Sequence, residues 1–374
     1  MVIAINFRIL SGNSAISKMM IDCFERIASG HREYEFIFIL EKKFDEQKAG
    51  LKNIKQIVLP QQSNNPLLWK LWYNYKLPAV LKKYKADILI TADGVCSLRT
   101  KLPQCLLVND FACLSHPEWY SKKYNRFIKT NTPAFLQKAK SIIAFSNVLK
   151  EEIQQQYKID EKKIAVLYPG ANRNYQPVNT EEKEQVKEKY TEGKEYFLFS
   201  GAIHPRSNLI NLLKAFSLFK KRQKSNMQLI IASDTVSEDK TFVGSLQLYK
   251  FRNEIKLMEN LDQDLLKKIT ATAYACINVS PLHTDIASLL NAMQCEVPVI
   301  AGNLYAAIEQ FGEAALYANE SVPEDIAEKL MLLYKDENKR NDLIKKGLHQ
   351  SAKFNPDATA IQLWQNILAT IQPL

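Results

Sequence analysis

The sequence predicts an α/β protein of two Rossmann-like, doubly wound domains that face each other across a cleft. At 374 residues the chain is longer than a typical single domain. Short apolar runs alternate with amphipathic helical patterns along the whole chain, which indicates parallel sheets covered by helices. Hydrophobic residues make up 46% of the chain and charged residues 24%, which is typical of a globular protein with a large core.

The first half of the chain contains apolar runs with the length and composition of buried strands. In order, these runs are VIAINF, EFIFIL, IKQIVL, DILITA, QCLLV, SIIAF and IAVLY. The segments SKMMIDCFERIA and NVLKEEIQQQY lie between them and repeat apolar residues at helical spacing. We therefore expect a parallel sheet with helices on its faces.

The second half repeats this pattern after a boundary. Pro169, Gly170 and Pro177 interrupt the chain, and a polar helix follows before a new strand begins near Tyr196. We expect a first domain over residues 1–177 and a second domain over residues 178–355. The expected strands of the second domain are EYFLFS, MQLIIA, YACINVS, VPVIAG and AALYA, and its helices include NLINLLKAFSLFKKRQ, DLLKKITAT and PEDIAEKLMLLYKD.

Positive charge is concentrated in the first half. Residues 1–178 contain 27 Lys and Arg against 15 Asp and Glu, whereas the remainder contains 23 against 25. This distribution indicates that the basic half faces something anionic, such as a membrane surface, a lipid phosphate or nucleic acid. A solvated surface that keeps the protein in solution explains the same excess, and charge alone does not separate the two.

The composition also bears on the compartment. Six cysteines lie scattered in mostly apolar contexts, so we expect buried, reduced thiols and neither disulfides nor a metal site. No stretch approaches the ~20 apolar residues that span a bilayer, and the start MVIAINFRIL resembles a first strand and not a signal peptide. We expect a cytoplasmic protein that can attach to the inner face of the membrane. The six cysteines are Cys23, Cys96, Cys105, Cys113, Cys276 and Cys295.

Ligands of open α/β sheets bind at the carboxyl ends of the strands, so the loops that follow strands are the expected sites of function. The first such loop holds Gly12 and Asn13 but lacks the G-x-G-x-x-G fingerprint of dinucleotide sites. Its backbone N–H groups can approach an anionic or hydroxylated ligand at a helix start, and an ordinary connection is the alternative. Asn109 and Asp110 end another buried strand and direct polar groups into the cleft, unless Asp110 simply caps the turn.

A loop of the second domain leads through Arg206, Ser207 and Asn208 into a long amphipathic helix. A guanidinium beside a helix N-terminus is a good phosphate site, because a fixed charge and free amides meet there. The alternative is that Arg206 is solvated and that Ser207 or Asn208 merely caps the helix.

The stretch PLHTDIASLLNAMQC places another helix start on a neighbouring loop. Two helix starts on adjacent loops suit a diphosphate, and Asn291 on the second helix can bond ribose hydroxyls. His283 lies at the mouth of this loop, where a hydrogen-bonded structural histidine is the alternative. The backbone amides that would face the diphosphate belong to Thr284, Asp285, Ile286, Ala287 and Ser288.

These blocks and their order resemble the retaining, nucleotide-sugar-dependent glycosyltransferases of family 4, the glycosyl transferases group 1 set. The resemblance runs nearly end to end, through NDFACLSHPEWYS, AKSIIAFSNVLKEEIQQQYKIDEKKIAVLYPGAN, YFLFSGAIHPRSNLINLLKAF, VPVIAGNLYAAIEQFGEAALYANES and FNPDATAIQLWQNIL. It implies the GT-B fold, with a terminal helix from about residue 356 to 374 that crosses back to the first domain.

The site residues implied by the resemblance depart from the family pattern. The family's His-Asp in the first domain is matched by Asn109 and Asp110, so only the acid is kept. Its Arg-Lys-Asn, which grips the donor diphosphate, is matched by Arg206, Ser207 and Asn208, without the lysine. Losing one charge-assisted diphosphate contact costs about 1.5–3 kcal/mol, or roughly one to two decades in affinity.

The next loop departs further. The family's Glu-Gly-Phe-Gly is matched by residues 283–286, His-Thr-Asp-Ile, and its ribose-binding glutamate is matched by Asn291. Replacing glycine restricts the backbone conformations with which the loop can approach phosphate. Asp285 is a possible substitute for the missing acid.

The resemblance implies a hexosyltransferase-type enzyme that moves a sugar from a nucleoside diphosphate sugar to an acceptor hydroxyl with retention, in the synthesis of a cell-surface polysaccharide or glycoconjugate. Arg206, Asn208 and the amides of residues 284–288 would hold the diphosphate, and Asn291 the ribose. Asp110 and His283 would be the catalytic residues, and the acceptor side would include Gly12, Asn13 and Asn109.

No metal or other cofactor is expected, because this fold generally needs none for the leaving group. The acceptor would be a saccharide or a lipid-linked saccharide, which the basic first domain would face at the inner membrane surface. The alternative function is a catalytically inactive binding or scaffold subunit, which the clustered changes favour. Nucleic-acid binding is not expected, because the sequence holds no recognised motif for it.

Overall fold

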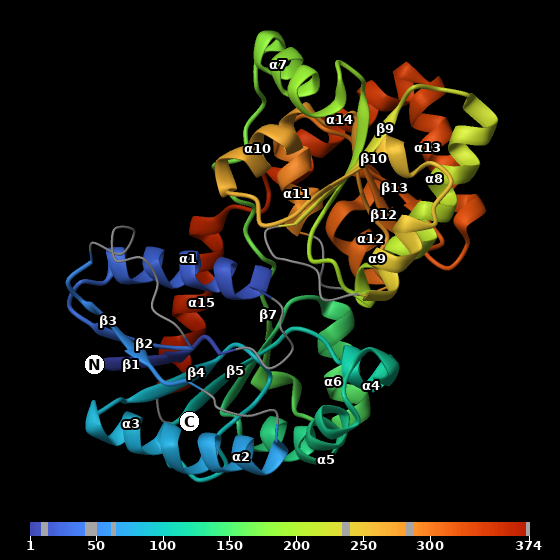
Figure 1. Ribbon diagram of the computed structural model, residues 1–374. Helices are drawn as coiled ribbons and strands as arrows, with labels where there is room; N and C mark the ends of the chain where they lie inside the picture. The colour runs from blue at the N-terminus through green and yellow to red at the C-terminus, as the bar shows by residue number, and fades with distance from the viewer. Residues whose placement is uncertain (9–13, 42–50, 61–64, 234–239, 282–286, 372–374) are drawn as a thin grey trace. The chain divides into compact units, whose positions relative to one another are not determined.

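A computed structural model describes residues 1–8, 14–41, 51–60, 65–233, 240–281 and 287–371. The chain forms two compact units, Met1–Gly170 with Pro356–Leu374, and Ala171–Asn355 (Figure 1). The second unit begins at Ala171. The sequence analysis expected this boundary a few residues later, between 177 and 178. Each unit is a parallel sheet with helices on both faces, which confirms the predicted pair of doubly wound domains.

The sheet of the first unit contains all seven expected strands, in the order β3-β2-β1-β4-β5-β6-β7, and all its pairs are parallel. The strands are β1 (Val2–Asn6), β2 (Glu35–Leu40), β3 (Ile54–Val58), β4 (Ile88–Thr91), β5 (Gln104–Val108), β6 (Ser141–Ala144) and β7 (Ile164–Val166). The helices are α1 (Ser14–Gly30), α2 (Pro66–Leu71), the π turn η1 (Trp72–Lys76), α3 (Leu77–Lys83), α4 (Ala112–Ser115), the 3₁₀ turn η2 (Pro117–Trp119), α5 (Lys122–Lys138), α6 (Asn147–Tyr157), the 3₁₀ turn η3 (Glu161–Lys163) and α15 (Pro356–Ile371).

The two faces of this sheet carry separate apolar cores, because successive side chains of a strand point to opposite faces. On β1, Ile3 and Ile5 face a core shared with α1 and α15, whereas Ala4 faces a core shared with α2, α3, α5 and α6. A strand that is buried on both faces reads as a continuous apolar run, which is why these strands could be recognised in the sequence.

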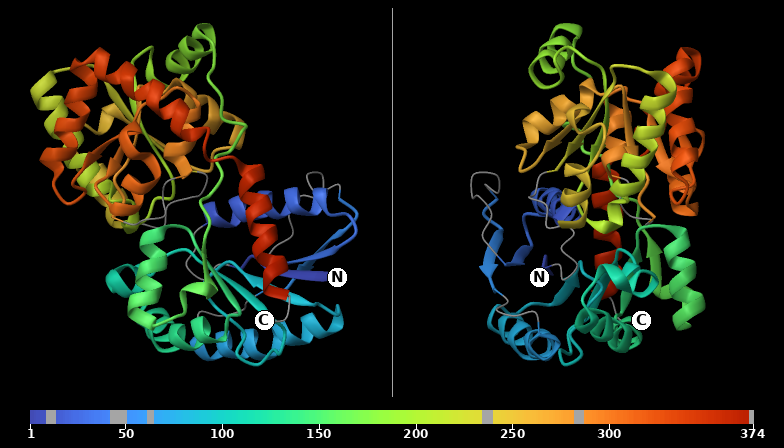
Figure 2. Two further views of the ribbon diagram at one scale, coloured as in Figure 1. Left: turned by 180° about the vertical axis from the view of Figure 1, so that it is seen from behind. Right: turned by 45° about the vertical axis from the view of Figure 1, so that its right-hand side comes forward.

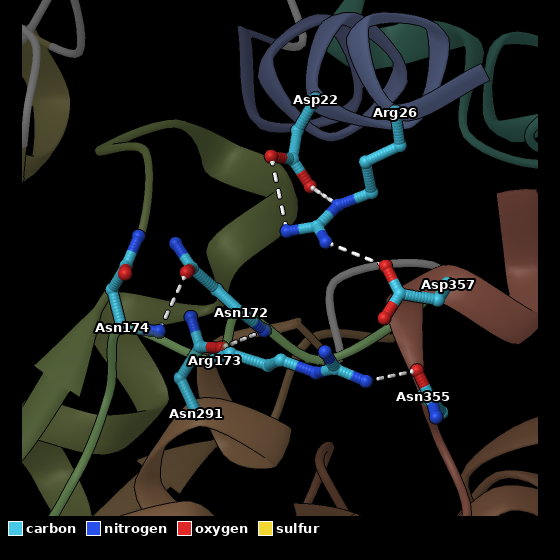
Figure 3. A network of polar contacts seen from close by, with 8 residues as sticks. All are labelled: Asp22, Arg26, Asn172, Arg173, Asn174, Asn291, Asn355 and Asp357. Atoms are coloured by element: carbon cyan, nitrogen blue, oxygen red, sulfur yellow. Dashed lines mark hydrogen bonds and ion pairs between the residues drawn. The ribbon is translucent and has the colours of Figure 1, made fainter. Parts of the chain in front are cut away.

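The terminal helix α15 belongs to the first unit, as the predicted crossing helix requires (Figure 2). Its Leu363, Trp364 and Ile367 are buried in the core beside α1. The Arg26 guanidinium also ties the start of α15 to α1, with Nε 2.9 Å from Asp22 Oδ2 and Nη1 2.7 Å from Asp357 Oδ1 (Figure 3).

The second unit has a six-stranded sheet in the order β10-β9-β8-β11-β12-β13. The strands are β8 (Tyr196–Ser200), β9 (Gln228–Ala232), β10 (Ile255–Met258), β11 (Ala275–Asn278), β12 (Val299–Gly302) and β13 (Ala315–Ala318). The helices are α7 (Thr180–Thr191), the 3₁₀ turn η4 (Pro205–Ser207), α8 (Leu209–Gln223), α9 (Lys240–Gln247), the 3₁₀ turn η5 (Arg252–Glu254), α10 (Gln263–Thr272), α11 (Ala287–Gln294), α12 (Tyr305–Phe311), the 3₁₀ turn η6 (Gly312–Ala314), α13 (Pro323–Lys335) and α14 (Glu337–Ser351).

Two further predictions concern the cysteines and the membrane. All six cysteines are buried, as expected, and the structure pairs none of them. Among the described residues, no helix has the length and apolar character needed to cross a bilayer.

Candidate functional site

Each sheet reverses its strand order at one point, where two neighbouring strands lead into connections that run to opposite sides. In the first unit this point lies between β1 and β4, and in the second unit between β8 and β11. Loops that leave the carboxyl ends of such strand pairs form the usual ligand site of an open α/β sheet. The described residues among those predicted from the second domain lie on the loop that follows β8 or on α11, the helix after β11.

The loop after β8 holds Arg206 in a 3₁₀ turn, before the helix. The helix α8 begins at Leu209, so Arg206 precedes it by three residues. The His204 ring caps the 3₁₀ turn, since its Nδ1 accepts a hydrogen bond from the Arg206 N–H at 3.2 Å. The Ser207 hydroxyl donates to the carbonyl oxygen of Ala202 at 2.6 Å, which closes the loop.

Arg206 is buried, with 5% of its surface exposed. The interpretation of Arg206 as a solvated residue is therefore wrong. A guanidinium keeps its charge in proteins, so its removal from water is costly unless anionic or polar partners compensate it. A guanidinium also binds phosphate groups through paired N–H donors.

Asn208 has left-handed backbone dihedrals, φ 56° and ψ 30°, a conformation that asparagine adopts more readily than most residues. Its side chain makes no cap to α8. Instead, Nδ2 donates to the carbonyl oxygens of Val279 at 3.0 Å and Glu320 at 2.7 Å. Asn208 therefore occupies the N-cap position of α8 without a side-chain cap bond, and its side chain ties the loop after β8 to the loops after β11 and β13.

The loops after β8 and β11 are also joined directly. The Ser280 hydroxyl donates to the Arg206 carbonyl oxygen at 2.8 Å, and the Ser280 N–H donates to Asn278 Oδ1 at 3.1 Å. Asn278 Nδ2 in turn lies 3.4 Å from the Ser288 hydroxyl at the start of α11. The structure thus brings Arg206, Asn208 and Ser288 together where the second sheet reverses.

Asn291 lies on α11, one turn beyond its start, with its side chain engaged within the unit. Its Oδ1 accepts the backbone N–H of Asn172 at 3.2 Å, and Asn172 Oδ1 accepts the Asn174 N–H at 3.0 Å (Figure 3). The oxygen that the predicted ribose contact requires already accepts one hydrogen bond. A carbonyl oxygen has a second lone pair, and the Asn291 amide group also carries donors.

Several predicted residues lie outside the described part of the chain. Ala287 is the first residue of α11 and is partly buried, as is Ser288. The residues outside the described ranges are Gly12, Asn13, His283, Thr284, Asp285 and Ile286.

In the first unit, Asn109 and Asp110 follow β5 and are partly buried. Asn109 Nδ2 donates to Asp110 Oδ2 at 2.9 Å, and Asp110 Oδ1 accepts the Ala112 N–H at 2.9 Å, where α4 begins. This is the capping contact that the alternative interpretation of Asp110 predicted. It fixes the orientation of the carboxylate.

A polar cluster that the sequence analysis missed lies at the carboxyl ends of β1 and β4. Arg8 is 3% exposed, and its guanidinium carbon lies 4.8 Å from the ring centroid of Trp72 and 5.5 Å from that of Tyr73. Arg8 Nε pairs with Glu41 Oε1 at 3.1 Å, and the Tyr73 hydroxyl donates to the Asp93 carboxylate. Arg8, Tyr73 and Asp93 therefore meet where the first sheet reverses.

Burial raises the pKa of Asp93 to about 6, although the Tyr73 hydrogen bond and the Arg8 charge act against this shift. Burial also raises the pKa of the Tyr73 hydroxyl well above its usual value, and the Asp93 charge adds to the rise. The carboxyl group of Asp93 consequently exchanges its proton near pH 6. In the sequence, the signal for this site was Asp93 with Gly94 directly after a buried strand, in the position that drew attention to Asn109 and Asp110.

Among the described residues, no group of three or more His, Cys, Asp or Glu side chains is placed to hold a metal ion. The expectation that catalysis needs no metal stays a prediction.

Comparisons with known families match both halves of the chain. The model "Glycosyltransferase Family 4" matches residues 30–175, and the model "Glycosyl transferases group 1" matches residues 180–350. The chain is 23% identical over 248 residues to O-antigen chain mannosyltransferase B of Escherichia coli, covering 66% of this chain and 65% of that protein. It is 26% identical over 262 residues to O-antigen chain mannosyltransferase RfbU of Salmonella typhimurium, covering 68% of this chain and 67% of that protein. The chain thus matches about two thirds of the length of these relatives.

Among solved structures, Anabaena Alr3699/HepE in complex with UDP-glucose superimposes with a TM-score of 0.79 at 13% identity, over 99% of this chain and 100% of that one. A likeness at this identity concerns the fold, and it extends over both domains. Because each domain also matches a glycosyltransferase model, the chain belongs to the glycosyltransferases of the GT-B fold.

Proposed function

We propose that this protein transfers a hexose from a nucleoside diphosphate sugar to an acceptor hydroxyl, with retention, during synthesis of a cell-surface polysaccharide. The bond between the anomeric carbon and the diphosphate oxygen breaks, and a bond to the acceptor oxygen forms on the same face of the sugar. The hydroxyl proton leaves with the nucleoside diphosphate. The relatives named above are O-antigen mannosyltransferases, so a nucleoside diphosphate mannose is the first donor to test.

The observation that carries this proposal is the junction of two loops by Ser280 and Asn278. Through these contacts the buried Arg206 and the start of α11 lie on the same edge of the second sheet. A fixed cation and a helix N-terminus stabilise the charge that develops on a leaving diphosphate, which in this reaction class is most of the catalytic work. Retention and the nature of the donor follow from the family resemblance.

The acceptor side would be the edge of the first sheet. Asp110 is held there by its bond to the Ala112 N–H, and Asp93 has a pKa near 6. Either carboxyl group can bind a sugar hydroxyl as an acceptor of hydrogen bonds. We propose a saccharide or lipid-linked saccharide as the acceptor.

A second candidate is a catalytically inactive binding subunit. The specific observation that favours it is the bond from the Asn172 N–H to Asn291 Oδ1, which occupies the group expected to hold the ribose. The loss of the family's lysine at Ser207 and of its loop glycines at residues 284 and 286 points the same way.

Thermal unfolding in the presence of a nucleotide panel separates the two. UDP, GDP and ADP, and the corresponding nucleoside diphosphate sugars, are each added in large excess. A ligand at about 100 times its dissociation constant stabilises the folded state by about 2.7 kcal/mol. A clear shift with one nucleotide, followed by release of the free diphosphate when an acceptor is added, supports the transferase. Stabilisation by none of the nucleotides supports the inactive subunit.

A further inference from the structure

The helix that runs from Pro66 to Lys83 has an unusual distribution of apolar residues. It consists of α2, η1 and α3 without a break, and Asn65 caps its start with Oδ1 3.0 Å from the Leu67 N–H. The wide π turn lies just before Pro78, which has no N–H for the helical ladder. The Leu77 N–H bonds instead to the carbonyl oxygen of Trp72.

One face of this helix is fully used by the core of the first unit. Trp69, Trp72, Tyr73 and Leu77 are at most 4% exposed. The Trp69 ring packs edge-on against Phe127 of α5, with 5.2 Å between the ring centroids. The fold therefore needs no further apolar residues on this helix.

The opposite face is apolar as well, yet it is exposed. Leu67 is 63%, Leu68 42%, Leu71 44% and Tyr75 49% exposed. Leu98, 37% exposed, lies beside them, because its N–H donates to Asn74 Oδ1 at 2.8 Å. These five residues, called here the α2 face, are five of the 14 large apolar side chains that are exposed among the described residues. An exposed apolar patch on a helix that is hydrophobic all round indicates an interaction surface.

The charge around the α2 face selects the partner. Residues 65–86 contain five lysines and no Asp or Glu, and residues 65–140 contain 13 Lys and Arg against 4 Asp and Glu. Lys70 and Lys76 are exposed on the same helix, and the Arg99 guanidinium carbon lies 4.3 Å from the Tyr75 ring centroid. The neighbouring helix α5, on the same side of the sheet (Figures 1 and 2), begins with Lys122, Lys123, Arg126 and Lys129.

We propose that the α2 face docks onto a lipid bilayer that contains anionic phospholipid. Leucine and tyrosine side chains would enter the boundary between headgroups and acyl chains, while the lysines contact lipid phosphates. The complementary charge favours an anionic bilayer over a neutral one, and over an apolar groove on another protein. This inference deepens the proposed function. Its consequence, that the enzyme meets a lipid-linked acceptor at the membrane, rests on that proposed function.

Vesicle flotation tests the docking without donor or acceptor. The full-length protein is mixed with phosphatidylcholine vesicles that contain about 30 mol% phosphatidylglycerol, or none. We expect binding to the anionic vesicles, with at least about a tenfold loss of partitioning for Leu67→Gln/Leu71→Gln. The matched control is Leu248→Gln, because Leu248 is 89% exposed in the second unit. We expect Lys70→Gln/Lys76→Gln to weaken binding to anionic vesicles and to reduce the salt dependence of that binding. The control Lys335→Gln/Lys345→Gln, in the second unit, should change neither.

A spectroscopic measurement covers the case in which the double leucine variant fails to fold. The six native cysteines are buried, so a single Leu68→Cys can be labelled selectively with an environment-sensitive dye. We expect a blue shift of its emission when anionic vesicles are added, and no shift for the same dye at Leu248→Cys.

The following results would overturn the proposal: no flotation of the unmodified protein with anionic vesicles, equal flotation of Leu67→Gln/Leu71→Gln, or an unshifted dye at position 68. Binding to native membranes but not to protein-free vesicles would also overturn it, in favour of a protein partner. Transfer to a water-soluble acceptor, measured in parallel, should be unchanged in Leu67→Gln/Leu71→Gln. If no sugar transfer is seen, the vesicle-binding result still tests the docking. If no vesicle binding is seen, the transfer assay still tests the proposed function.

Discussion

The Ser280 hydroxyl donates a hydrogen bond to the backbone carbonyl oxygen of Arg206 at 2.8 Å. The two residues are 74 positions apart in the chain, and both are buried. Because β8 and β11 are neighbours at the point where the second sheet reverses, this bond joins the two loops that would hold the donor. Removing this hydrogen bond tests how strongly the proposed donor site depends on the contact between the two loops.

Replacing Ser280 with alanine leaves the Arg206 carbonyl oxygen without this donor. We expect the free energy of unfolding to fall by about 1–2 kcal/mol, because a buried acceptor loses its partner. The nucleotide-induced rise in melting temperature should fall with it. Urea unfolding with and without nucleotide measures both, and Ser321→Ala at an exposed serine is the control. An unchanged nucleotide response would show that the loops act independently.

Replacing Arg206 with glutamine removes the fixed charge at the proposed diphosphate site. We expect affinity for the donor nucleotide to fall roughly 10- to 100-fold, the usual loss for a charge-assisted contact. Arg206→Lys should recover part of it, because the charge remains while the planar pair of donors is lost. Titration calorimetry checks this, with Arg252→Gln on an exposed arginine of the same unit as the control. Equal affinity in Arg206→Gln would place the diphosphate elsewhere.

The raised pKa of Asp93 predicts a pH dependence of stability. Its pKa is about 6 in the folded protein against 3.8 ordinarily, so the folded state binds more protons between these values. Stability therefore falls as pH rises from about 4 to 6, by up to about 3 kcal/mol from this group. Asp93→Asn should remove this slope. Chemical unfolding at a series of pH values measures it, and an identical profile in the variant would assign the slope to other groups.

Gly170 lies against Pro356, where the two segments that connect the units run together. A Cβ atom at position 170 would lie 2.4 Å from the Pro356 Cα, which is backbone and cannot rotate away. We expect Gly170→Ala to lower the free energy of unfolding by about 1–3 kcal/mol through overpacking. Gly30→Ala is the matched control, since a Cβ there meets nothing within 4 Å. Equal melting temperatures of the two variants would contradict the close packing.

Most of the fold could be predicted because its strands are buried on both faces. Apolar runs marked most of the strands that the structure describes, and the run IKQIVL marked the partly buried edge strand β3, whereas β10 was missed. This strand, IKLM at the edge of the sheet, is short and only partly buried, and it carries Lys256 in its middle. An edge strand is covered less than a central one, so its sequence is constrained less.

The candidate site was predicted where residues directly follow a strand, and missed where they depend on distant partners. Arg206, Asn208 and Asn291 were found from their positions next to strand ends or on the following helix. The bonds that Asn208 and Asn291 make instead, to Val279, Glu320 and the Asn172 N–H, have no local signature in the sequence.

The sequence by itself determined the two doubly wound domains, the segments that form them and the loops in which to search for a site. Apolar periodicity and chain breakers are local features of the sequence. The alternation of strand patterns with helix patterns then predicts a parallel sheet. Only the tertiary structure decided which loops meet. The meeting of Arg8, Tyr73 and Asp93 depends on the pairing of β1 with β4, which are more than eighty residues apart. Strand order in a sheet is set by the packing of the whole domain, so no local pattern specifies which side chains share its reversal point.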